Sequence, residues 1–315
     1  MNVLQDKLPV IAVFRGGKNH PAVSLSDGAS ILASLKRCGY DPADIVIEHN
    51  GAHLLNGLPV DEHMIVTLAD GIVDTTYDHT HAYTDLARRA GVPVFFSREH
   101  TPLYKTEEDI YRVLRMAGIT VPDTTVIRSA TNSPEKLLSI WKRMHTPYLV
   151  RASAPFAKGV STIVRSFQDF VHHVQYLQSA GHDVQVISYT HAPTYSLAVL
   201  PRYRGNAVYV PLPVMTETTK NEAPHKGSTI RKQPPLSMKE KDALIEHARA
   251  IYTLLQLEGP ALVDCIYDAQ GNIVTVGVDR SPSFHPEGRF MQSLSTTGVE
   301  LGHYVHEHVM SLFTR

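Results

Sequence analysis

Two aspartates on neighbouring predicted strands are the residues whose types and spacing most clearly suggest chemistry. Asp264 lies inside an alternating apolar run, and Asp279 ends the apolar run that follows it. Residues 269–272, Ala-Gln-Gly-Asn, have the composition of a tight turn, so we expect a β-hairpin over residues 259–282. Carboxylate oxygens brought together in this way can hold a divalent cation. The alternative is an ordinary exposed hairpin that carries one acid per strand.

The elements that must position these acids fall into three predicted units, residues 1–98, 99–185 and 186–315. In the first unit apolar strand-like runs alternate with amphipathic helical segments, which predicts a parallel α/β sheet covered on both faces. The expected strands are residues 8–14, 44–48, 64–68 and 92–96, and the expected helices are residues 24–39 and 85–90.

The second and third units follow a different order. The second reads as helices, a strand, a loop, a strand and a helix, and the third contains strands, a long amphipathic helix, the hairpin and a closing helix. The expected segments are 107–116, 133–145, 148–151, 161–164, 167–178, 183–188, 194–200, 208–214, 239–256 and 299–313. Residues 216–235 are polar and lack apolar periodicity, so we expect a long loop that is functional or disordered.

Composition narrows the class of protein. The chain has 315 residues, 43% of them hydrophobic and 19% charged, with a net charge of −1. This near neutrality gives no reason to expect nucleic acid or an anionic membrane as a partner. No apolar run reaches the roughly 18–20 residues of a membrane span, and we expect no signal peptide. The two distant cysteines, Cys38 and Cys265, are expected to be reduced thiols of a cytoplasmic protein.

Histidine is abundant, with 18 residues, and clusters at residues 78–81 and 303–308. A transition-metal site is one interpretation of these clusters. Neither cluster has a cysteine or an acidic partner set at fixed spacing, so surface or core histidines are the favoured interpretation.

The hairpin resembles the last strands of the ATP-grasp fold of D-alanine–D-alanine ligases. In that family an Arg-x-Asp and a Glu-x-Asn on these strands hold two Mg²⁺ ions and the transferring phosphate. Here Asp264 matches the aspartate, whereas Leu262, Gly277 and Asp279 stand at the arginine, glutamate and asparagine positions. The resemblance implies an α/β protein in which a Rossmann-like pre-ATP-grasp domain precedes the ATP-grasp fold. One Mg²⁺ held by Asp264 and Asp279 remains a candidate.

The resemblance also identifies candidate nucleotide-binding residues. Arg151 ends a strand that in the family ends in a phosphate-contacting lysine, and a guanidinium contacts phosphate with a different shape. The second family lysine falls on Glu107, and Lys105 could replace it only if the loop shifts. Lys158 and Gly159 lie in the segment that matches the phosphate loop. The alternative for that segment is a plain turn with a solvated lysine.

Substrate positions are matched less well. Val23-Ser24-Leu25 follows the family's Glu-Val-Ser-Leu motif, with Ala22 in place of the glutamate that helps to hold the first D-alanine. We take Ser24 as a candidate catalytic residue on this match. Arg280 is the best substitute for the arginine missing at Leu262, because it lies beside the acid at the strand end.

Three hypotheses follow. The first is a degenerate ATP-grasp protein that acts by binding a nucleotide, a metabolite or another protein. The second is a divergent but active ATP-dependent carboxylate–amine ligase for a cell-wall precursor, which uses ATP and Mg²⁺. The third is a structural module without a ligand. The expected partner is a small molecule, a nucleotide or a D-amino acid, and the resemblance implies a homodimer through the first domain.

Overall fold

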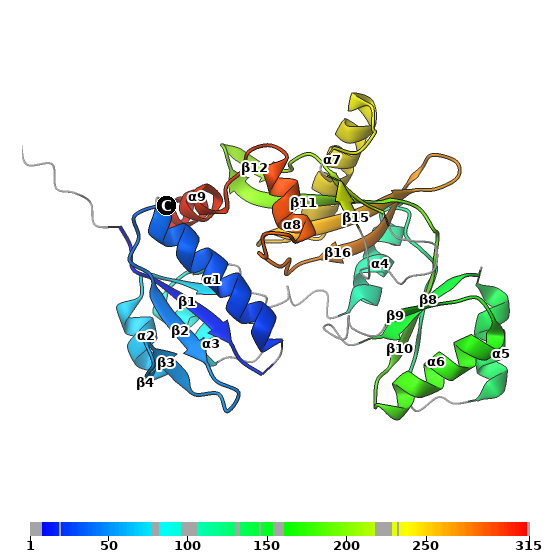
Figure 1. Ribbon diagram of the computed structural model, residues 1–315, viewed down its shortest axis with the longest axis horizontal. Helices are drawn as coiled ribbons and strands as arrows, with labels where there is room; N and C mark the ends of the chain where they lie inside the picture. Colours follow the sequence, from blue (N-terminus) through cyan, green and yellow to red (C-terminus); the bar gives the residue numbers. More distant parts are fainter. Residues whose placement is uncertain are drawn as a thin grey trace, which may run out of the picture.

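The computed structural model describes residues 8–18, 20–76, 82–95, 106–129, 133–144, 146–153, 161–217, 229–231 and 233–313. Within them the chain forms three sheets with helices packed against each. Figure 1 shows the first domain, the small green lobe and the C-terminal lobe as three bodies, with the C-terminal lobe joining the other two.

The first sheet is built from six strands in the order β4-β3-β2-β1-β5-β6. Strands β2, β1, β5 and β6 run parallel, as predicted, and β3 and β4 add an antiparallel edge beside β2. The elements are β1 (Ile11–Gly16), α1 (Pro21–Arg37), β2 (Ala43–Ile47), β3 (His53–Leu55), β4 (Leu58–Val60), α2 (Glu62–Leu68), β5 (Gly71–Asp74), α3 (Ala82–Ala90) and β6 (Val94–Phe95).

Alternation along β1 explains why both faces of this sheet are covered. Ile11 and Val13 pack in the core that contains residues of α1, whereas Ala12 and Phe14 pack in the core that contains residues of α2 and α3. A strand whose successive side chains point to opposite faces needs a helix on each side to bury them. The predicted layering of the first unit is therefore confirmed.

The strand predicted over residues 64–68 is wrong, because this segment lies in helix α2. Asp61 caps the helix, and its carboxylate accepts a hydrogen bond of 2.8 Å from the His63 amide. Ile65 and Val66 are buried, whereas Met64 and Leu68 are 53% and 57% exposed, so the segment is a helix with one face on the core and not a strand buried along its length. The buried strand of this region is β5 instead.

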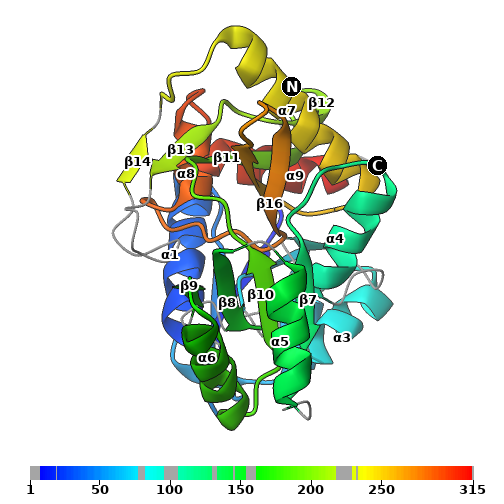
Figure 2. The same ribbon diagram turned by 90° about the vertical axis from the view of Figure 1, so that its right-hand side faces the viewer.

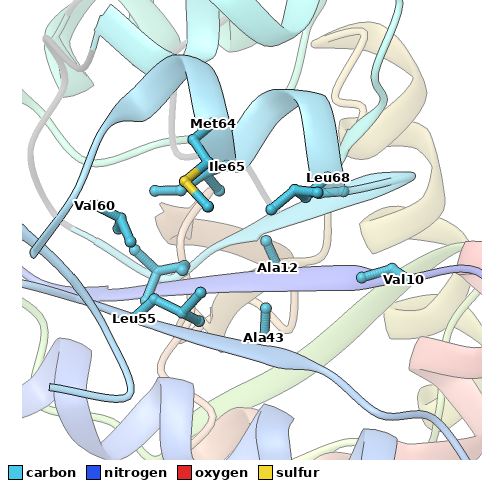
Figure 3. A pocket seen from close by; sticks show the side chains of 10 residues that line it. Val10, Ala12, Ala43, Leu55, Val60, Met64, Ile65 and Leu68 are labelled. Atoms are coloured by element: carbon cyan, nitrogen blue, oxygen red, sulfur yellow. The ribbon is translucent and has the colours of Figure 1, made fainter. Parts of the chain in front are cut away.

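An apolar cavity of about 40 Å³ lies between the first sheet and α2 (Figure 3). Its wall contains no polar side chain and none of the predicted site residues. The residues that line it are Val10, Ala12, Ala43, Ile45, Leu55, Val60, Met64, Ile65, Leu68 and Ala69.

The small lobe is an antiparallel sheet in the order β7-β10-β8-β9. Helices α5 and α6 pack side by side against it, as Figure 2 shows. Trp141, Tyr148 and Phe170 meet in its core with ring centroids 4.8–6.0 Å apart. The elements are β7 (Thr124–Ile127), α5 (Pro134–Arg143), β8 (Tyr148–Ala152), β9 (Ser161–Val164), α6 (Phe167–Ser179) and β10 (Val184–Ser188).

The C-terminal lobe contains the third sheet, in the order β14-β13-β11-β15-β16, with β12 paired to β11. The loop predicted over residues 216–235 is wrong in part, because residues 216–217 belong to β13 and residues 229–231 form β14, whereas residues 218–228 lie outside the described residues. The elements are β11 (Thr194–Tyr203), β12 (Asn206–Tyr209), β13 (Val214–Glu217), β14 (Thr229–Arg231), α7 (Met238–Leu254), β15 (Ala261–Tyr267), β16 (Ile273–Asp279), α8 (Arg289–Ser295) and α9 (Leu301–Phe313).

The two faces of this third sheet belong to different cores. One face packs against α7 and also against α4 (Glu107–Met116), which precedes the small lobe in sequence. The other face packs against α8, α9 and the first domain, so that Ile11 of β1 and Leu262 of β15 share one core. The first domain and the C-terminal lobe are thus joined by continuous apolar packing. The unit boundaries near residues 98 and 185 stay predictions.

Candidate functional site

The predicted hairpin of β15 and β16 is present, and its register determines where the two acids lie. Asp264 pairs with Gly277, and Leu262 pairs with Asp279. The two aspartates are therefore diagonal neighbours on one face of the sheet, an arrangement that typically separates residues by about 7–8 Å. This is the face that packs against α8.

Both carboxylate oxygens of Asp264 are engaged by protein groups. The Ser196 hydroxyl donates to Oδ1 at 2.6 Å, and Nη1 of Arg289 donates to Oδ2 at 2.6 Å. The same Arg289 nitrogen lies 3.3 Å from the Ser196 hydroxyl. The ion pair is largely shielded, since the Asp264 side chain is 14% exposed and the Arg289 side chain 20%. Asp264 is therefore held as half of an ion pair.

The residues present do not fit the two-metal site of an ATP-grasp ligase. Gly277 supplies no carboxylate, and Asp264 is held by a guanidinium. Asp279 Oδ1 accepts a hydrogen bond of 3.0 Å from the Ser281 amide. Among the described residues no group of three His, Cys, Asp or Glu side chains could hold a metal ion, and this includes the histidines of residues 303–308. The cluster at residues 78–81 lies outside the described residues.

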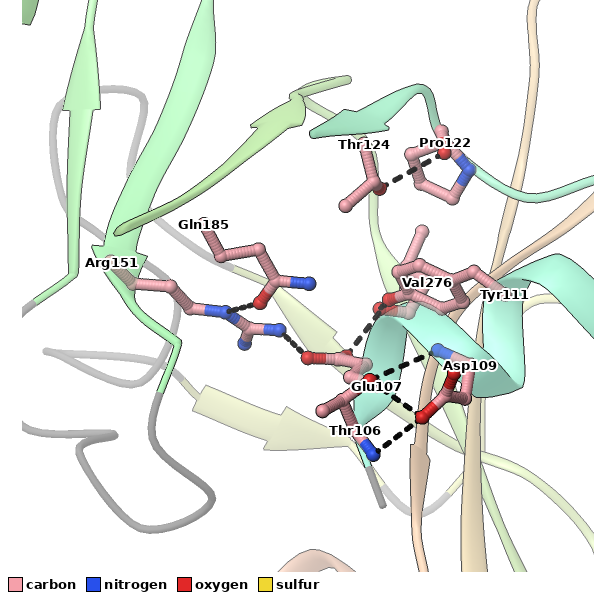
Figure 4. A network of polar contacts seen from close by, with 9 residues as sticks. All are labelled: Thr106, Glu107, Asp109, Tyr111, Pro122, Thr124, Arg151, Gln185 and Val276. Atoms are coloured by element: carbon pink, nitrogen blue, oxygen red, sulfur yellow. Dashed lines mark hydrogen bonds and ion pairs between the residues drawn. The ribbon is translucent and has the colours of Figure 1, made fainter. Parts of the chain in front are cut away.

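A second ion pair joins the two positions that match the phosphate-contacting lysines. Nη2 of Arg151 on β8 donates to Oε2 of Glu107 in the first turn of α4, and Nε donates to the Gln185 side chain at 2.9 Å (Figure 4). The Tyr111 hydroxyl lies 2.9 Å from Glu107 Oε1 and 2.7 Å from the Val276 carbonyl oxygen. Glu107 thus links the small lobe to β16.

Burial and neighbouring charges shift the pKa of Arg151 in opposite directions. Burial, the largest single effect, lowers the pKa of the Arg151 guanidinium, but the Glu107 carboxylate and Tyr111 together outweigh it, so the net pKa is raised above the ordinary value. Burial, with help from Glu107, raises the pKa of Tyr111 well above its ordinary value. Arg151 therefore stays charged and Tyr111 neutral at physiological pH.

Arg280 follows β16 and is partly buried. Burial lowers the pKa of its guanidinium, whereas Asp279, Asp109 and Glu107 raise it. Asp109 itself closes the capping box of α4 with Thr106 (Figure 4). The structure therefore brings Arg280 and Arg151 to the same acidic first turn of α4. The role of Arg280 in catalysis stays a prediction.

Ser24 is completely buried near the start of α1. Its hydroxyl oxygen accepts a hydrogen bond of 2.8 Å from the Gly16 amide, and its carbonyl lies 3.3 Å from the Thr75 hydroxyl. These bonds account for a serine at this position through the fold of the first domain. A catalytic role for Ser24 stays a prediction. Lys105, Lys158 and Gly159, the other candidate nucleotide-binding residues, lie outside the described residues.

Sequence analysis missed two residues at this junction, Arg289 and Asp27. The buried Asp27 carboxylate of α1 accepts 2.8 Å hydrogen bonds from the Ser283 hydroxyl and the Phe284 amide, and so fixes the segment after β16. Neither residue stands in a motif that matches the family. A charged residue at a buried helix position, such as Asp27 among Ile31 and Leu35, was the one available signal.

An α/β chain whose antiparallel small lobe and C-terminal sheet follow a Rossmann-like domain has the ATP-grasp architecture, and the sequence comparison names the family. Residues 113–310 match the family described as D-ala D-ala ligase C-terminus. Because this match covers more than half of the chain, the protein belongs to the D-Ala-D-Ala ligase family. No curated protein matches the sequence.

Solved structures of the family share the fold at low sequence identity. The chain is similar to D-alanyl-alanine synthetase A from Vibrio cholerae O1 biovar eltor, with a TM-score of 0.78, 13% identity and coverage of 98% of this chain and 100% of that one. For the VanG D-Ala:D-Ser ligase from Enterococcus faecalis the TM-score is 0.75 and the identity 17%, over 97% and 99% of the chains.

A third similar structure contains a nucleotide. The D-alanine–D-alanine ligase from Bacillus anthracis, complexed with ATP, has a TM-score of 0.76 and 14% identity, over 98% of both chains. In the described part of the present chain, no helix is both long and apolar enough to cross a membrane.

Proposed function

We propose that this member of the D-Ala-D-Ala ligase family acts in the cytoplasm by binding a small molecule between its lobes and is impaired in, or lacks, ligase activity. The expected ligand is a nucleotide or a D-amino acid. We include ATP and Mg²⁺ as cofactors only for the case in which the site still catalyses the ATP-dependent reaction.

The Arg151–Glu107 ion pair carries this proposal. Phosphoryl transfer depends on cations that neutralise the developing charge of the transferring group. At the two positions where the family has lysines, this chain has one cation and one anion, and they bind each other. A triphosphate would have to displace Glu107 from Arg151 and then meet the carboxylate. The pair therefore opposes ATP binding in the family's manner.

A second observation supports the same conclusion at the other end of the hairpin. Leu262, at the position of the family's arginine, is 3% exposed and packs in the core shared with the first domain. The family's arginine stabilises the acyl phosphate, and loss of one such donor typically lowers the rate by about 10²–10³-fold. Leucine supplies no donor here.

The alternative is a divergent active ligase that forms a C–N bond with a rebuilt site, and Arg280 is the observation that favours it. This guanidinium is partly buried beside Asp279, at the end of the strand that carries the family's metal ligands. A rebuilt site would use Arg280 and Arg151 as its cations and Asp264 and Asp279 as its acids, with Lys158 contributed from the phosphate loop.

Phosphate release from Mg·ATP, measured with and without D-alanine, tests the proposal. The expected result is no D-alanine-dependent release, because the phosphate cations are compensated internally. A D-alanine-dependent rate of about 1 s⁻¹ or more, which is ordinary for enzymes, would establish the alternative. Calorimetric titration of Mg·ATP into the wild type and into Asp264→Ala separates binding from turnover, and a flat wild-type titration would exclude the ligase.

The homodimer is retained as part of the proposal. Met64 and Leu68, at the cavity beside α2, are 53% and 57% exposed, and exposed apolar side chains on the first domain support an interface there. Sedimentation velocity of the wild type and of Leu68→Glu tests it. The wild type should sediment as a dimer and the variant as a monomer, and a monomeric wild type would exclude this interface.

A further inference from the structure

Arg289, the first residue of α8, forms an ion pair with Asp264, which matches a metal-holding aspartate of ATP-grasp ligases in the sequence. We propose that this guanidinium is a permanent substitute for the metal, so that the protein binds its ligand between the lobes without a divalent cation. The inference rests on the proposed function only in taking the space between the lobes as the binding site.

The contacts of Asp264 leave little for a metal to bind. Mg²⁺ requires close to octahedral oxygen coordination at about 2.0–2.1 Å. Arg289 holds Oδ2 and Ser196 holds Oδ1, each at 2.6 Å. A cation that approached Asp264 would displace the guanidinium or lie beside it and be repelled. The Ser196 hydroxyl, which is completely buried, completes a closed set of partners.

The helix that carries Arg289 is fixed by packing. Phe290 and Leu294 of α8 are buried in the core that joins the first domain to the C-terminal lobe. Phe290 packs edge-to-face against Phe284, with ring centroids 5.6 Å apart. The buried Ser293 hydroxyl binds the Ala198 amide of β11 at 3.1 Å. Because its helix is anchored on both sides, Arg289 is a positioning residue for Asp264 with little freedom to swing away.

The lack of a carboxylate at Gly277 is a second feature that disfavours metal binding beside Asp264. A Cβ atom built at Gly277 would lie 3.4 Å from Asp264 Oδ2, which is an ordinary contact. A side chain is therefore tolerated opposite Asp264, and its absence leaves the site one carboxylate short. With Arg289 in place and no acid at residue 277, the charges balance as an ion pair without a metal.

The test measures metal binding without nucleotide or D-alanine. Mn²⁺, a spectroscopic probe for Mg²⁺ sites, is titrated into the wild type, Arg289→Met, and Arg289→Met with Gly277→Glu, and free Mn²⁺ is followed by electron paramagnetic resonance. Methionine keeps an unbranched stem but removes the charge. The wild type should bind no Mn²⁺ at this position. The double variant should bind one Mn²⁺ per chain at least about tenfold more tightly than the wild type.

Two controls assign the effect to this carboxylate and this charge. Adding Asp264→Ala to the double variant should abolish Mn²⁺ binding. Arg289→Lys with Gly277→Glu keeps the positive charge and should bind Mn²⁺ more weakly than the double variant with methionine.

Thermal unfolding with and without MgCl₂ gives a second readout, because a metal that binds only the folded state raises the melting temperature. Magnesium should stabilise the double variant and leave the wild type unchanged.

Two results would overturn the inference. One is stoichiometric Mn²⁺ binding by the wild type that disappears in Asp264→Ala, a result that needs no variant of Arg289. The other is a folded double variant, with wild-type circular dichroism, that gains no affinity for Mn²⁺. Neither result bears on ligase activity, which is decided by D-alanine-dependent phosphate release, so the two proposals fail separately.

Discussion

At the scale of single residues, the charged side chains of the candidate site form ion pairs with each other. Glu107 binds Arg151, and Asp264 binds Arg289. All four side chains are less than a third exposed, so water screens these pairs only partly. Removing one partner then leaves a shielded charge uncompensated, which is more costly than the net contribution of the intact pair.

The Glu107–Arg151 pair leads to a prediction about stability. Glu107→Ala should lower the free energy of unfolding by about 1–3 kcal/mol, because it leaves the shielded Arg151 guanidinium without its charged acceptor, whereas the Tyr111 hydroxyl keeps the Val276 carbonyl. Urea denaturation measures the change. Asp85→Ala is the matched control, since it breaks the exposed pair between Asp85 and Arg88, and exposed pairs contribute about 0–1 kcal/mol. Equal losses in the two variants would contradict the prediction.

At the scale of elements, helix α9 contains a buried histidine whose protonation opposes folding. His308 is 6% exposed and packs on Phe95 of β6. Burial is the main cause that lowers its pKa to about 4; the nearby positive charge of Arg202 acts in the same direction, and a hydrogen bond with the Pro201 backbone raises the pKa by a smaller amount. The unfolded chain would protonate this histidine near pH 6.5.

The sign of the pH effect follows from these two values. Between pH 6.5 and 4 the unfolded state binds more protons at His308 than the folded state, so stability should fall as pH falls through this window. The contribution is complete above about pH 6.5 and amounts to about 3 kcal/mol. Urea denaturation across this range should give a flatter profile for His308→Leu.

The control for this experiment lies on the same helix. His303 of α9 is exposed, so His303→Ala should leave the pH profile of stability unchanged. A wild-type slope that persists in His308→Leu would assign the pH dependence to another group.

At the scale of the whole molecule, the first domain and the C-terminal lobe share an apolar core, whereas the small lobe has a core of its own, so we expect two units that open separately. Residues of β1, α1, β15, α8 and α9 share one apolar cluster. The cluster of the small lobe contains residues from β7–β10, α5 and α6, and Met144 directly after α5. A lobe with a separate core, joined to α4 by polar contacts such as Arg151–Glu107, can open without disturbing the larger unit.

Amide hydrogen exchange of two phenylalanine variants tests this division. Phe290→Ala should lower the opening free energy of both β1 and β15 by about 3–5 kcal/mol, because residues of both strands belong to the core from which it removes a ring. Protection of β8 and β10 should change less. Phe170→Ala is the matched control, since it empties the core of the small lobe and should reverse the pattern. Equal loss of protection in all four strands would contradict two separate units.

Local patterns in the sequence determined most of the elements. The spacing of residues in helix α4 and in strand β9 predicted both with the observed bounds, and alternation around a Gly-containing turn predicted the hairpin of β15 and β16. The resemblance at Asp264 also indicated the ATP-grasp fold and the family. These features are local, because hydrophobic periodicity and turn composition act within about ten residues.

Only the tertiary structure decided what the charged residues do. Glu107 and Arg151 are 44 residues apart, and Asp264 and Arg289 are 25 apart, so no periodicity relates them. Their pairing depends on how the small lobe meets α4 and on how α8 packs on the third sheet. The short apolar run at residues 64–68 was likewise ambiguous until the cap at Asp61 and the packing of Ile65 made it a helix. Contacts between elements determine which charges pair and which secondary structure a short apolar segment adopts. Local sequence patterns do not specify these contacts.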